Sequence, residues 1–442
     1  MTISKILELI QKEKVKEIAL QFTDIIGILH SLWVPSKIFS KVAENGIHTD
    51  GSSLGMVDVS KSDLKLLPDL DTFTILPPKL FPKRVARVVC DIYEPESDRP
   101  FMYDPRFVLK EVINDVKKSF GASVTYKTAS EIEYFVFTKG EDGEIKLLDE
   151  GGYLATPPTD RGADLRLEIV DTFRDMGILI EKHHHEVPPG KYELNLEYSH
   201  GLKMADTVYL VKFLVKLMAA QRGLIASFMP KPFHGEFGAG LHTHLSLIDV
   251  DKAENLFYDP TGSYRLSKTA LSFLAGILTH AKALAGITNP SVNSYKRLVP
   301  GWEAPVYISW AWYNRSVLVR VPPGEGLQTR LEYRPTDGSC NFYIAYAALL
   351  AAGLDGIRRN LEHPPPVEED IYDMSEQERV ERGIEVLPGN LGDALREFAK
   401  DTYLRETLGQ AFCKKFLELK MKEWRDFSVT VHPWERKKYL DI

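Results

Sequence analysis

The stretch Ser130-Glu131-Ile132-Glu133-Tyr134-Phe135-Val136-Phe137 decides how the rest of the chain is interpreted. Its aromatic and β-branched residues predict a buried strand. Because side chains alternate along a strand, Glu131 and Glu133 point to the same face. At an effective dielectric of about 20, two carboxylates about 4 Å apart repel by roughly 4 kcal/mol. The pair therefore needs protons, basic partners or divalent cations, and a salt-bridged rim pair and a cation site are both open at this point.

The composition is that of a soluble globular enzyme. The 442 residues are 44% hydrophobic and 26% charged, and this length predicts roughly two or three domains. The formal net charge of −7 argues against a nucleic-acid partner. Cys90, Cys340 and Cys413 are odd in number and widely spaced, which favours a reducing cytoplasm over a disulfide framework. The longest apolar run, 343–354, is too short for a membrane span, so we expect a cytoplasmic protein without membrane contact.

Local signals predict the elements that precede the central strand. Residues 15–35 alternate in polarity on either side of Asp24–Gly27, which predicts a β-hairpin. Asp104 and Pro105 have the residue types of an N-cap and a first helical turn, and the helix should run to about Phe120.

The sequence also predicts a division of the chain into two domains. We place the boundary near residue 100, so that 1–100 and 101–442 fold separately. Residues 293–305 predict a Gly/Pro-rich loop, and 389–426 predict a helical tail.

A second group of acidic and imidazole side chains lies within residues 178–198. The patterns on either side of Pro188-Pro189-Gly190 predict two strands joined by a turn, which brings Glu186 and Glu193 together. His183-His184-His185 alone could indicate a zinc site. No cysteine lies nearby and carboxylates are in the majority, so a harder cation is the better interpretation.

A third group consists of His242 and His244, two residues apart on a predicted strand. This spacing puts both imidazoles and Ser246 on one face and leucines on the other. The pattern is more typical of a site wall than of a core.

Basic residues gather on two neighbouring predicted strands, 314–321 and 330–334. Arginines and a glutamate that share faces suit an anionic substrate with phosphates. A surface ladder of ion pairs is the alternative, and it fits Arg330 better than the others. The residues concerned are Arg315, Arg320, Arg330, Glu332 and Arg334.

Taken in order, these motifs resemble the glutamine synthetases of the prokaryotic type I family, in its shorter form, over essentially the whole chain. No single motif is specific, but their order and spacing are. They are Asp50-Gly51-Ser52-Ser53, Glu131-Ile132-Glu133, His184-His185-Glu186-Val187 with Glu193, Lys231-Pro232, Gly238 to His244, Lys296 to Pro305, Asn314-Arg315-Ser316 and Glu332-Tyr333-Arg334.

The resemblance implies an α+β fold. A small N-terminal β-grasp-like domain would precede a larger catalytic domain, whose curved antiparallel sheet and surrounding helices enclose the metals. The implied reaction is the ATP-dependent ligation of ammonia to L-glutamate through γ-glutamyl phosphate, with glutamate, ammonium and ATP as ligands. The implied assembly is a homo-oligomer of stacked hexameric rings with active sites between subunits.

The resemblance also implies roles for individual residues. Two divalent cations, Mg²⁺ or Mn²⁺, would be held by Glu133, Glu186 and Glu193 and by Glu131, His242 and Glu332. The transferring phosphoryl group would be bound by Arg315, Arg320 and Arg334. Along the nucleotide would lie Glu181, His244, Ser246 and Arg330. The glutamate substrate would meet Arg297 and the backbone of Gly238, while ammonium would meet Asp50 and, on a closing flap within 293–305, Glu303.

Several positions depart from the family pattern. Phe237 stands where the family usually has Asn, and Asp58 stands where the short form has an arginine tied to product feedback. Residues 337–343 lack both prolines of the family's stretch, and the loop after Asp50 is one residue shorter. These departures concern the exact substrate and its feedback. The C-terminal part also lacks the segment that carries the adenylylated tyrosine of the longer form, so we do not expect that modification.

Two other functions compete with glutamine synthesis. One is a γ-glutamyl-amine ligase of the same superfamily, acting on a polyamine or ethanolamine. The other is a catalytically inactive regulatory or structural homologue, which should lack some of the six metal ligands, whereas this sequence has them all. Asp50 and Glu303 favour ammonium, because a small cation needs carboxylates and little room.

Overall fold

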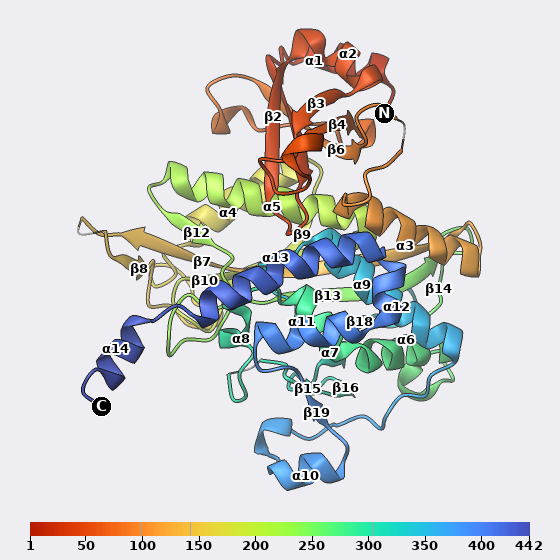
Figure 1. Cartoon of the computed structure of the whole chain (residues 1–442), viewed down its shortest axis with the longest axis vertical. Coiled ribbons are helices and arrows are strands. Elements are labelled where there is room, and N and C mark those ends of the chain that lie inside the picture. Colours follow the sequence, from red (N-terminus) through yellow and green to blue (C-terminus); the bar gives the residue numbers. More distant parts are fainter. Residues whose placement is uncertain (98, 142, 303) are drawn as a thin grey trace.

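The computed structural model describes residues 1–97, 99–141, 143–302 and 304–442. It has two parts, an N-terminal domain at one end and a larger domain in which a sheet is covered by helices (Figure 1).

The N-terminal domain is built on a mixed sheet of strands in the order β2-β1-β6-β4-β3, with β5 beside β6. The predicted hairpin is confirmed, because β1 and β2 pair antiparallel from Glu17↔Pro35 to Thr23↔Leu29. β1 also pairs with β6, and these two strands run parallel. β1 therefore lies between β2 and β6 in the sheet. The elements are α1 (Ile3–Lys12), β1 (Glu17–Thr23), β2 (Leu29–Pro35), α2 (Phe39–Asn45), β3 (Ile47–Asp50), β4 (Asp63–Pro68), β5 (Thr74–Ile75) and β6 (Val85–Tyr93).

The larger domain contains, among the described residues, a sheet of eleven strands with the path β16-β17-β18-β13-β7-β10-β9. Its centre is the predicted strand, now β7, which lies between β13 and β10 and also pairs with the shorter strands β8, β11 and β12. The strands are β7 (Val124–Lys139), β8 (Ile145–Leu147), β9 (Ile180–His185), β10 (Lys191–Leu196), β11 (Ser199–His200), β12 (Ile225–Ser227), β13 (Leu241–Asp249), β14 (Glu254–Asn255), β16 (Trp310–Trp312), β17 (Val319–Val321) and β18 (Leu331–Tyr333).

The expected antiparallel order fails at one edge of this sheet, where β16 and β17 run parallel. The chain between them makes an irregular excursion that starts at Tyr313, whose φ is 68°. These residues, 313–318, form no regular element, and β17 then runs in the direction of β16. For the same reason Arg315 lies in a bend and not on a strand, which corrects the expectation from the sequence.

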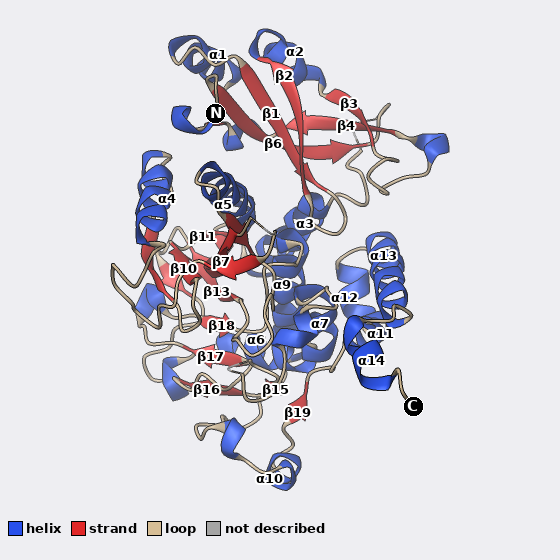
Figure 2. Cartoon of the chain, turned by 90° about the vertical axis from the view of Figure 1, so that its left-hand side faces the viewer, coloured by secondary structure: helices blue, strands red, loops and turns tan. Residues whose placement is uncertain are grey.

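Helices pack against the sheet and against one another (Figure 2). The expected helix 105–120 is confirmed as α3, and Asp104 caps it by accepting a hydrogen bond from the backbone of Arg106. α6 and α9 approach closely, since a Cβ on Gly276 would lie 2.1 Å from the carbonyl oxygen of Ala352. The helices are α3 (Pro105–Phe120), α4 (Ala163–Asp175), α5 (Gly201–Gln221), α6 (Lys268–Thr279), α7 (Ala281–Thr288), α8 (Ser294–Arg297), α9 (Phe342–Arg359), α10 (Glu376–Glu381), α11 (Leu391–Lys400), α12 (Thr402–Thr407), α13 (Gln410–Ser428) and α14 (Pro433–Tyr439).

Two further comparisons with the sequence concern helices. The expected loop 293–305 begins with the short helix α8, because the hydroxyl groups of Ser291 and Ser294 bond each other and hold that turn. Within the described ranges no single helix is long and apolar enough to cross a membrane; α6 and α7 together would reach that length, but they are bent by 73°.

Candidate active site

The candidate active site is assembled by the register of the strands beside β7. Glu131 faces His242 of β13, and Glu133 faces Glu193 of β10. On the other side of β13, Glu332 of β18 faces His244. Residues far apart in the sequence, such as Glu131 and His242, therefore meet on adjacent strands, and β13 brings Glu332 to the same group.

The six predicted metal ligands converge. Glu131, His242 and Glu332 can each offer a donor atom within 4.8 Å of the others. The same distance holds for Glu133, Glu193 and His242, and for His184, Glu186 and Glu193. These groups share members, so they form one carboxylate centre, defined by the six predicted ligands. His184 is an additional donor at its edge.

Basic side chains balance the charge of Glu332. One carboxylate oxygen accepts from Arg334 Nη1 at 2.6 Å and the other from Arg320 Nη1 at 2.6 Å. Burial would raise the pKa of Glu332, but the charges of Arg334, His244 and His242 outweigh it and lower the pKa to about 2. Glu332 is thus an anion clamped between two arginines.

Glu133 is held in a similar way by a residue that the sequence reasoning missed. Lys191 Nζ lies 2.7 Å from Glu133 Oε2, and the backbone N–H of Gly240 donates to the same oxygen at 2.5 Å. Burial opposes ionisation, yet Lys191, then His242 and Arg297, bring the pKa of Glu133 to about 2. The signal was present in the alternation of β10, which puts Lys191 and Glu193 on one face.

The remaining acids rely on imidazoles. Glu131 accepts from His242 Nδ1 and His244 Nε2, each at 3.2 Å, and these bonds outweigh burial and hold its pKa well below the usual value. Glu186 differs, because burial and the charge of Glu133 raise its pKa. His184 lies 3.4 Å from Glu186 and 3.2 Å from Glu193, and the bond to Glu193 raises its own pKa.

The donor set fits a hard divalent cation. Five carboxylates and one imidazole provide mainly oxygen ligands, which suit Mg²⁺ or Mn²⁺, and the cysteines Cys90, Cys340 and Cys413 are buried and uninvolved in the cluster.

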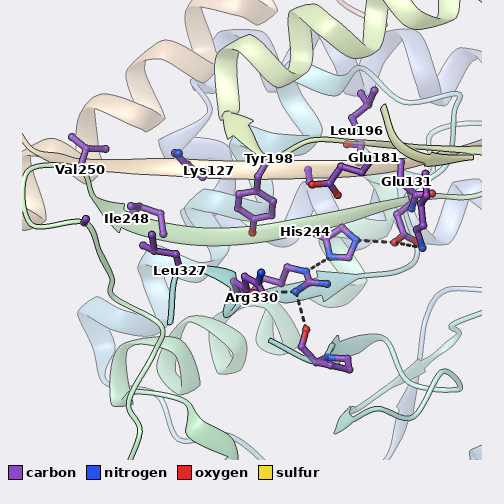
Figure 3. A pocket seen from close by; sticks show the side chains of 17 residues that line it. Lys127, Glu131, Glu181, Leu196, Tyr198, His244, Ile248, Val250, Leu327 and Arg330 are labelled. Carbon is purple, nitrogen blue, oxygen red and sulfur yellow. Dashed lines mark hydrogen bonds and ion pairs between the residues drawn. The ribbon is translucent and has the colours of Figure 1, made fainter. Parts of the chain in front are cut away.

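A cavity of about 680 Å³ opens beside the carboxylate centre (Figure 3). Its wall includes Glu131 and three of the predicted nucleotide residues, Glu181, His244 and Arg330. Arg330 Nε donates to His244 Nδ1 at 3.3 Å, and His244 Nε2 reaches Glu131, so a hydrogen-bonded chain leads from the cavity into the centre. Ser246, the fourth predicted nucleotide residue, is fully buried on the same strand.

Arg297 is buried, and its charge is one of those that lower the pKa of Glu133. Its guanidinium donates to the carbonyl oxygen of Pro335 at 2.5 Å, and burial lowers its pKa. Glycines make room for it: a Cβ on Gly240 would stand 2.5 Å from Arg297 Nη2, and one on Gly238 would stand 2.6 Å from Cγ.

Two predicted residues that the structure describes, Asp50 and Arg315, are not brought to the centre. Asp50 is exposed at the end of β3 in the N-terminal domain (Figures 1 and 2), where Ser53 and Ser52 bond its carboxylate and lower its pKa to about 2. Arg315 is exposed in the bend before β17. Glu303 lies outside the described residues.

Comparison with known proteins decides the family. Residues 102–439 match the family described as glutamine synthetase, catalytic domain, and residues 14–95 match the glutamine synthetase beta-Grasp domain. The chain belongs to the glutamine synthetase family. This confirms the expected α+β fold with a β-grasp domain at the N-terminus.

Relatives match the glutamine synthetase chain along its full length. The glutamine synthetase of Thermotoga maritima is 46% identical over 443 residues and 100% of each chain is covered. That of Thermus thermophilus is 45% identical, with 99% of each chain covered. A solved structure described as apo GmaS without ligand is 32% identical with a TM-score of 0.88 over 100% of both chains. The cryo-EM structure of Plasmodium falciparum glutamine synthetase, at 23% identity, TM-score 0.86 and 99% coverage of both chains, shares the fold.

The departures from the glutamine synthetase pattern have structural counterparts. The ring of Phe237 packs edge-on against Trp302, with centroids 5.8 Å apart, and Lys231 Nζ lies 4.4 Å from the Trp302 ring centre. Without its prolines, the 337–343 stretch is held by hydrogen bonds: Asp337 accepts from the backbone of Ser339 at 2.9 Å. Both departures therefore border the loops that surround Arg297.

One residue beside the carboxylate centre emerged only from the structure. The ring of Tyr153 meets His184 edge-on, with centroids 5.5 Å apart, and Tyr153 is 58% exposed. The sequence analysis did not single out this Gly-Gly-Tyr segment or the acids Asp149 and Glu150 just before it.

Proposed function

We infer that this chain catalyses the ATP-dependent ligation of ammonia to L-glutamate, giving L-glutamine, ADP and phosphate through γ-glutamyl phosphate. One observation carries the inference: in a chain of this family, the carboxylate centre converges beside a cavity of about 680 Å³. A carboxylate is a poor electrophile, so the γ-carboxylate of glutamate must first accept a phosphoryl group from ATP.

Within this reaction we propose that Glu133, Glu186 and Glu193 hold one divalent cation and Glu131, His242 and Glu332 a second, as Mg²⁺ or Mn²⁺. Their mutual proximity supports the assignment. Bound cations would neutralise the phosphate oxygens. Arg320 and Arg334, both 2.6 Å from Glu332, stand beside the same place and can bear charge that develops on the phosphoryl group, as we propose for Arg315.

The cavity suits the nucleotide. Glu181, His244 and Arg330 line it, and we propose that they contact ATP, with Ser246 behind them. The glutamate substrate would lie nearer Arg297 and Gly238.

The ammonium site that we propose lies between two subunits. Asp50 is exposed at the end of β3, and Figure 2 shows β3 in the N-terminal domain, apart from β7, β10 and β13. We propose that it serves a neighbouring subunit's site, in a homo-oligomer of stacked hexameric rings, with Glu303 as a second acid. The buried, unpaired cysteines agree with the cytoplasmic location that we propose.

The test of function is phosphate release and product formation with ATP, glutamate and Mg²⁺, comparing ammonium with ethanolamine and a polyamine. We expect the larger kcat/KM for ammonium. A tenfold preference for an amine, about 1.4 kcal/mol, would reassign the nucleophile and leave the phosphoryl-transfer site standing. Failure of every nucleophile to raise phosphate release would contradict the proposed reaction.

The test of assembly uses two inactive variants, Asp50→Ala and Glu332→Ala. Co-expressed chains that mix at random should pair intact halves at about one site in four and recover that share of activity. No recovery in verified mixed oligomers would place Asp50 outside the neighbour's site.

A further inference from the structure

Behind the carboxylate centre lies a second buried cluster, Asp149, Asp160 and His185, whose donor atoms also come within 4.8 Å of one another. Its oxygens already have protein partners. Asp160 binds both terminal nitrogens of Arg166, at 3.0 and 2.6 Å. The cluster is therefore a hydrogen-bond network rather than a cation site.

Asp149 is the hub of this network. Its side chain is fully buried and accepts five hydrogen bonds between 2.6 and 3.2 Å. Three reach Oδ1 and two reach Oδ2. The donors are His185 Nε2, the backbone N–H groups of Gly190 and Gly151, the Tyr192 hydroxyl and the backbone N–H of Arg161.

These donors belong to segments that carry site residues. Gly151 and Arg161 bracket the loop that holds Tyr153, and Gly190 ends the turn that Glu186 begins. The bond from Asp149 continues through His185, whose Nδ1 donates to the carbonyl oxygen of Glu186 at 2.6 Å.

Glu186 depends on that backbone support more than Glu133 and Glu332 do. Glu332 has two arginines, and Glu133 has Lys191 and a backbone N–H. In the described part of the chain, the carboxylate of Glu186 has weaker partners, the N–H of Val187 at 3.2 Å and His184 at 3.4 Å. The charges of Glu133 and Glu193 also push against it.

We propose that Asp149 is a positioning residue, which fixes the main chain at Glu186 and the loop of Tyr153 so that the first cation site is preformed. The proposal rests on the proposed function, because it takes Glu186 as a metal ligand. Asp149 itself touches neither substrate nor cation.

The test is the variant Asp149→Asn, with Mn²⁺ binding measured by calorimetry in the absence of substrates. A carboxamide has one acceptor oxygen, so whichever way it turns, its NH₂ group faces N–H or O–H donors. We expect the dissociation constant of one Mn²⁺ site to rise about tenfold, as for other groups that orient metal ligands, while the second site stays within about twofold.

The matched control is Asp160→Asn, in the same cluster. This variant places an NH₂ group against Arg166, so it should lower the unfolding temperature about as much as Asp149→Asn does. Asp160 makes no hydrogen bond to Gly190 or His185 in the described structure. Both Mn²⁺ sites should therefore stay within about twofold of wild type. If Asp149→Asn does not fold, Tyr192→Phe removes one of the five bonds and should give a smaller rise at the same site.

Three outcomes of these measurements test the positioning role of Asp149. A selective loss at one Mn²⁺ site in Asp149→Asn, absent in Asp160→Asn, supports the positioning role. Wild-type Mn²⁺ binding in a folded Asp149→Asn or Tyr192→Phe protein overturns it and leaves the proposed function intact. A wild-type protein that binds no Mn²⁺ overturns the metal assignment and this proposal together.

Discussion

Two of the clusters of charged side chains in the larger domain differ in how many acids they gather and in what lies beside them. The first is the carboxylate centre. The second lies among the helices, where His280 stands between two acids, 3.0 Å from Asp355 and 2.5 Å from Asp401. Arg359 pairs with Asp355 at 2.8 Å, so two acids have two basic partners.

The difference separates a cluster for stability from one for binding. In the His280 cluster two acids share one imidazole, Arg359 also pairs with Asp355, and the group joins helices α7, α9 and α12. In the carboxylate centre five acids gather, Glu131 and Glu332 share His242, and a cavity lies beside them. Several carboxylates kept next to open space are what divalent cations require.

The largest effect should come from breaking the carboxylate centre. Glu133→Gln removes a charge but keeps an oxygen that accepts from Gly240, so the fold should survive. We expect kcat to fall about 10³-fold, roughly 4 kcal/mol, because stabilisation of charge in the transition state is lost. Steady-state phosphate release measures it. Glu197→Gln, at an exposed acid just beyond β10, is the control, and equal activity of the two variants would contradict the metal assignment.

The His280 cluster should respond in stability instead. His280→Ala leaves the buried Asp355 and the partly buried Asp401 with one fewer basic partner, and we expect the free energy of unfolding to fall by about 3 kcal/mol. Urea denaturation followed by tryptophan fluorescence measures it. His48→Ala, at an exposed histidine of β3, should change stability by less than about 0.5 kcal/mol. A large loss of kcat in folded His280→Ala protein would show that the two clusters are not separate in function.

The smallest expected effect concerns how the stability contribution of His280 depends on pH. Burial lowers the pKa of His280, but its bonds to Asp401 and Asp355 prevail and raise it above its usual value near 6.5. Its contribution is therefore complete below about pH 6.5 and is lost as the pH rises through the higher folded-state pKa.

The stability difference between wild type and His280→Ala should accordingly shrink above about pH 6.5, by about 1.4 kcal/mol for each unit of the rise in pKa. Urea titrations from acid to alkaline pH would show it, and a difference that grows with pH would be inconsistent with a protonated His280. The carboxylate centre has the opposite sign, because the pKa of Glu133 falls to about 2, so its contribution is lost on acidification below about 4.5.

Local and periodic signals predicted a large part of the fold. Alternation predicted the β1–β2 hairpin, and Asp104 with Pro105 predicted the start of α3, because both depend on neighbours in sequence. Alternation also put Glu131 and Glu133 on one face, and His242 and His244 on another.

The sequence did not predict features that depend on contacts between residues far apart in the chain. Lys191 is an unremarkable lysine until β10 pairs with β7 and sets it beside Glu133. Asp149 resembled a loop acid, because its five donors come from segments up to 43 residues away. Arg315 was placed on a strand that begins only at Val319, since the local pattern cannot show a parallel pair formed around an irregular excursion. Register and long-range burial, which fix such contacts, leave little trace in a single sequence.

The length of β7 has a consequence for synthesis. The strand leaves the ribosome well before β13, which begins about 100 residues later and covers its flank, an interval of roughly 5 to 20 s at ordinary rates of translation. During that interval a long strand rich in Tyr, Phe and Val is without a main partner and prone to join other nascent chains. Glu131 and Glu133 interrupt it with like charges, which oppose such pairing. The acids proposed as metal ligands thus also place like charges on the strand before β13 covers it.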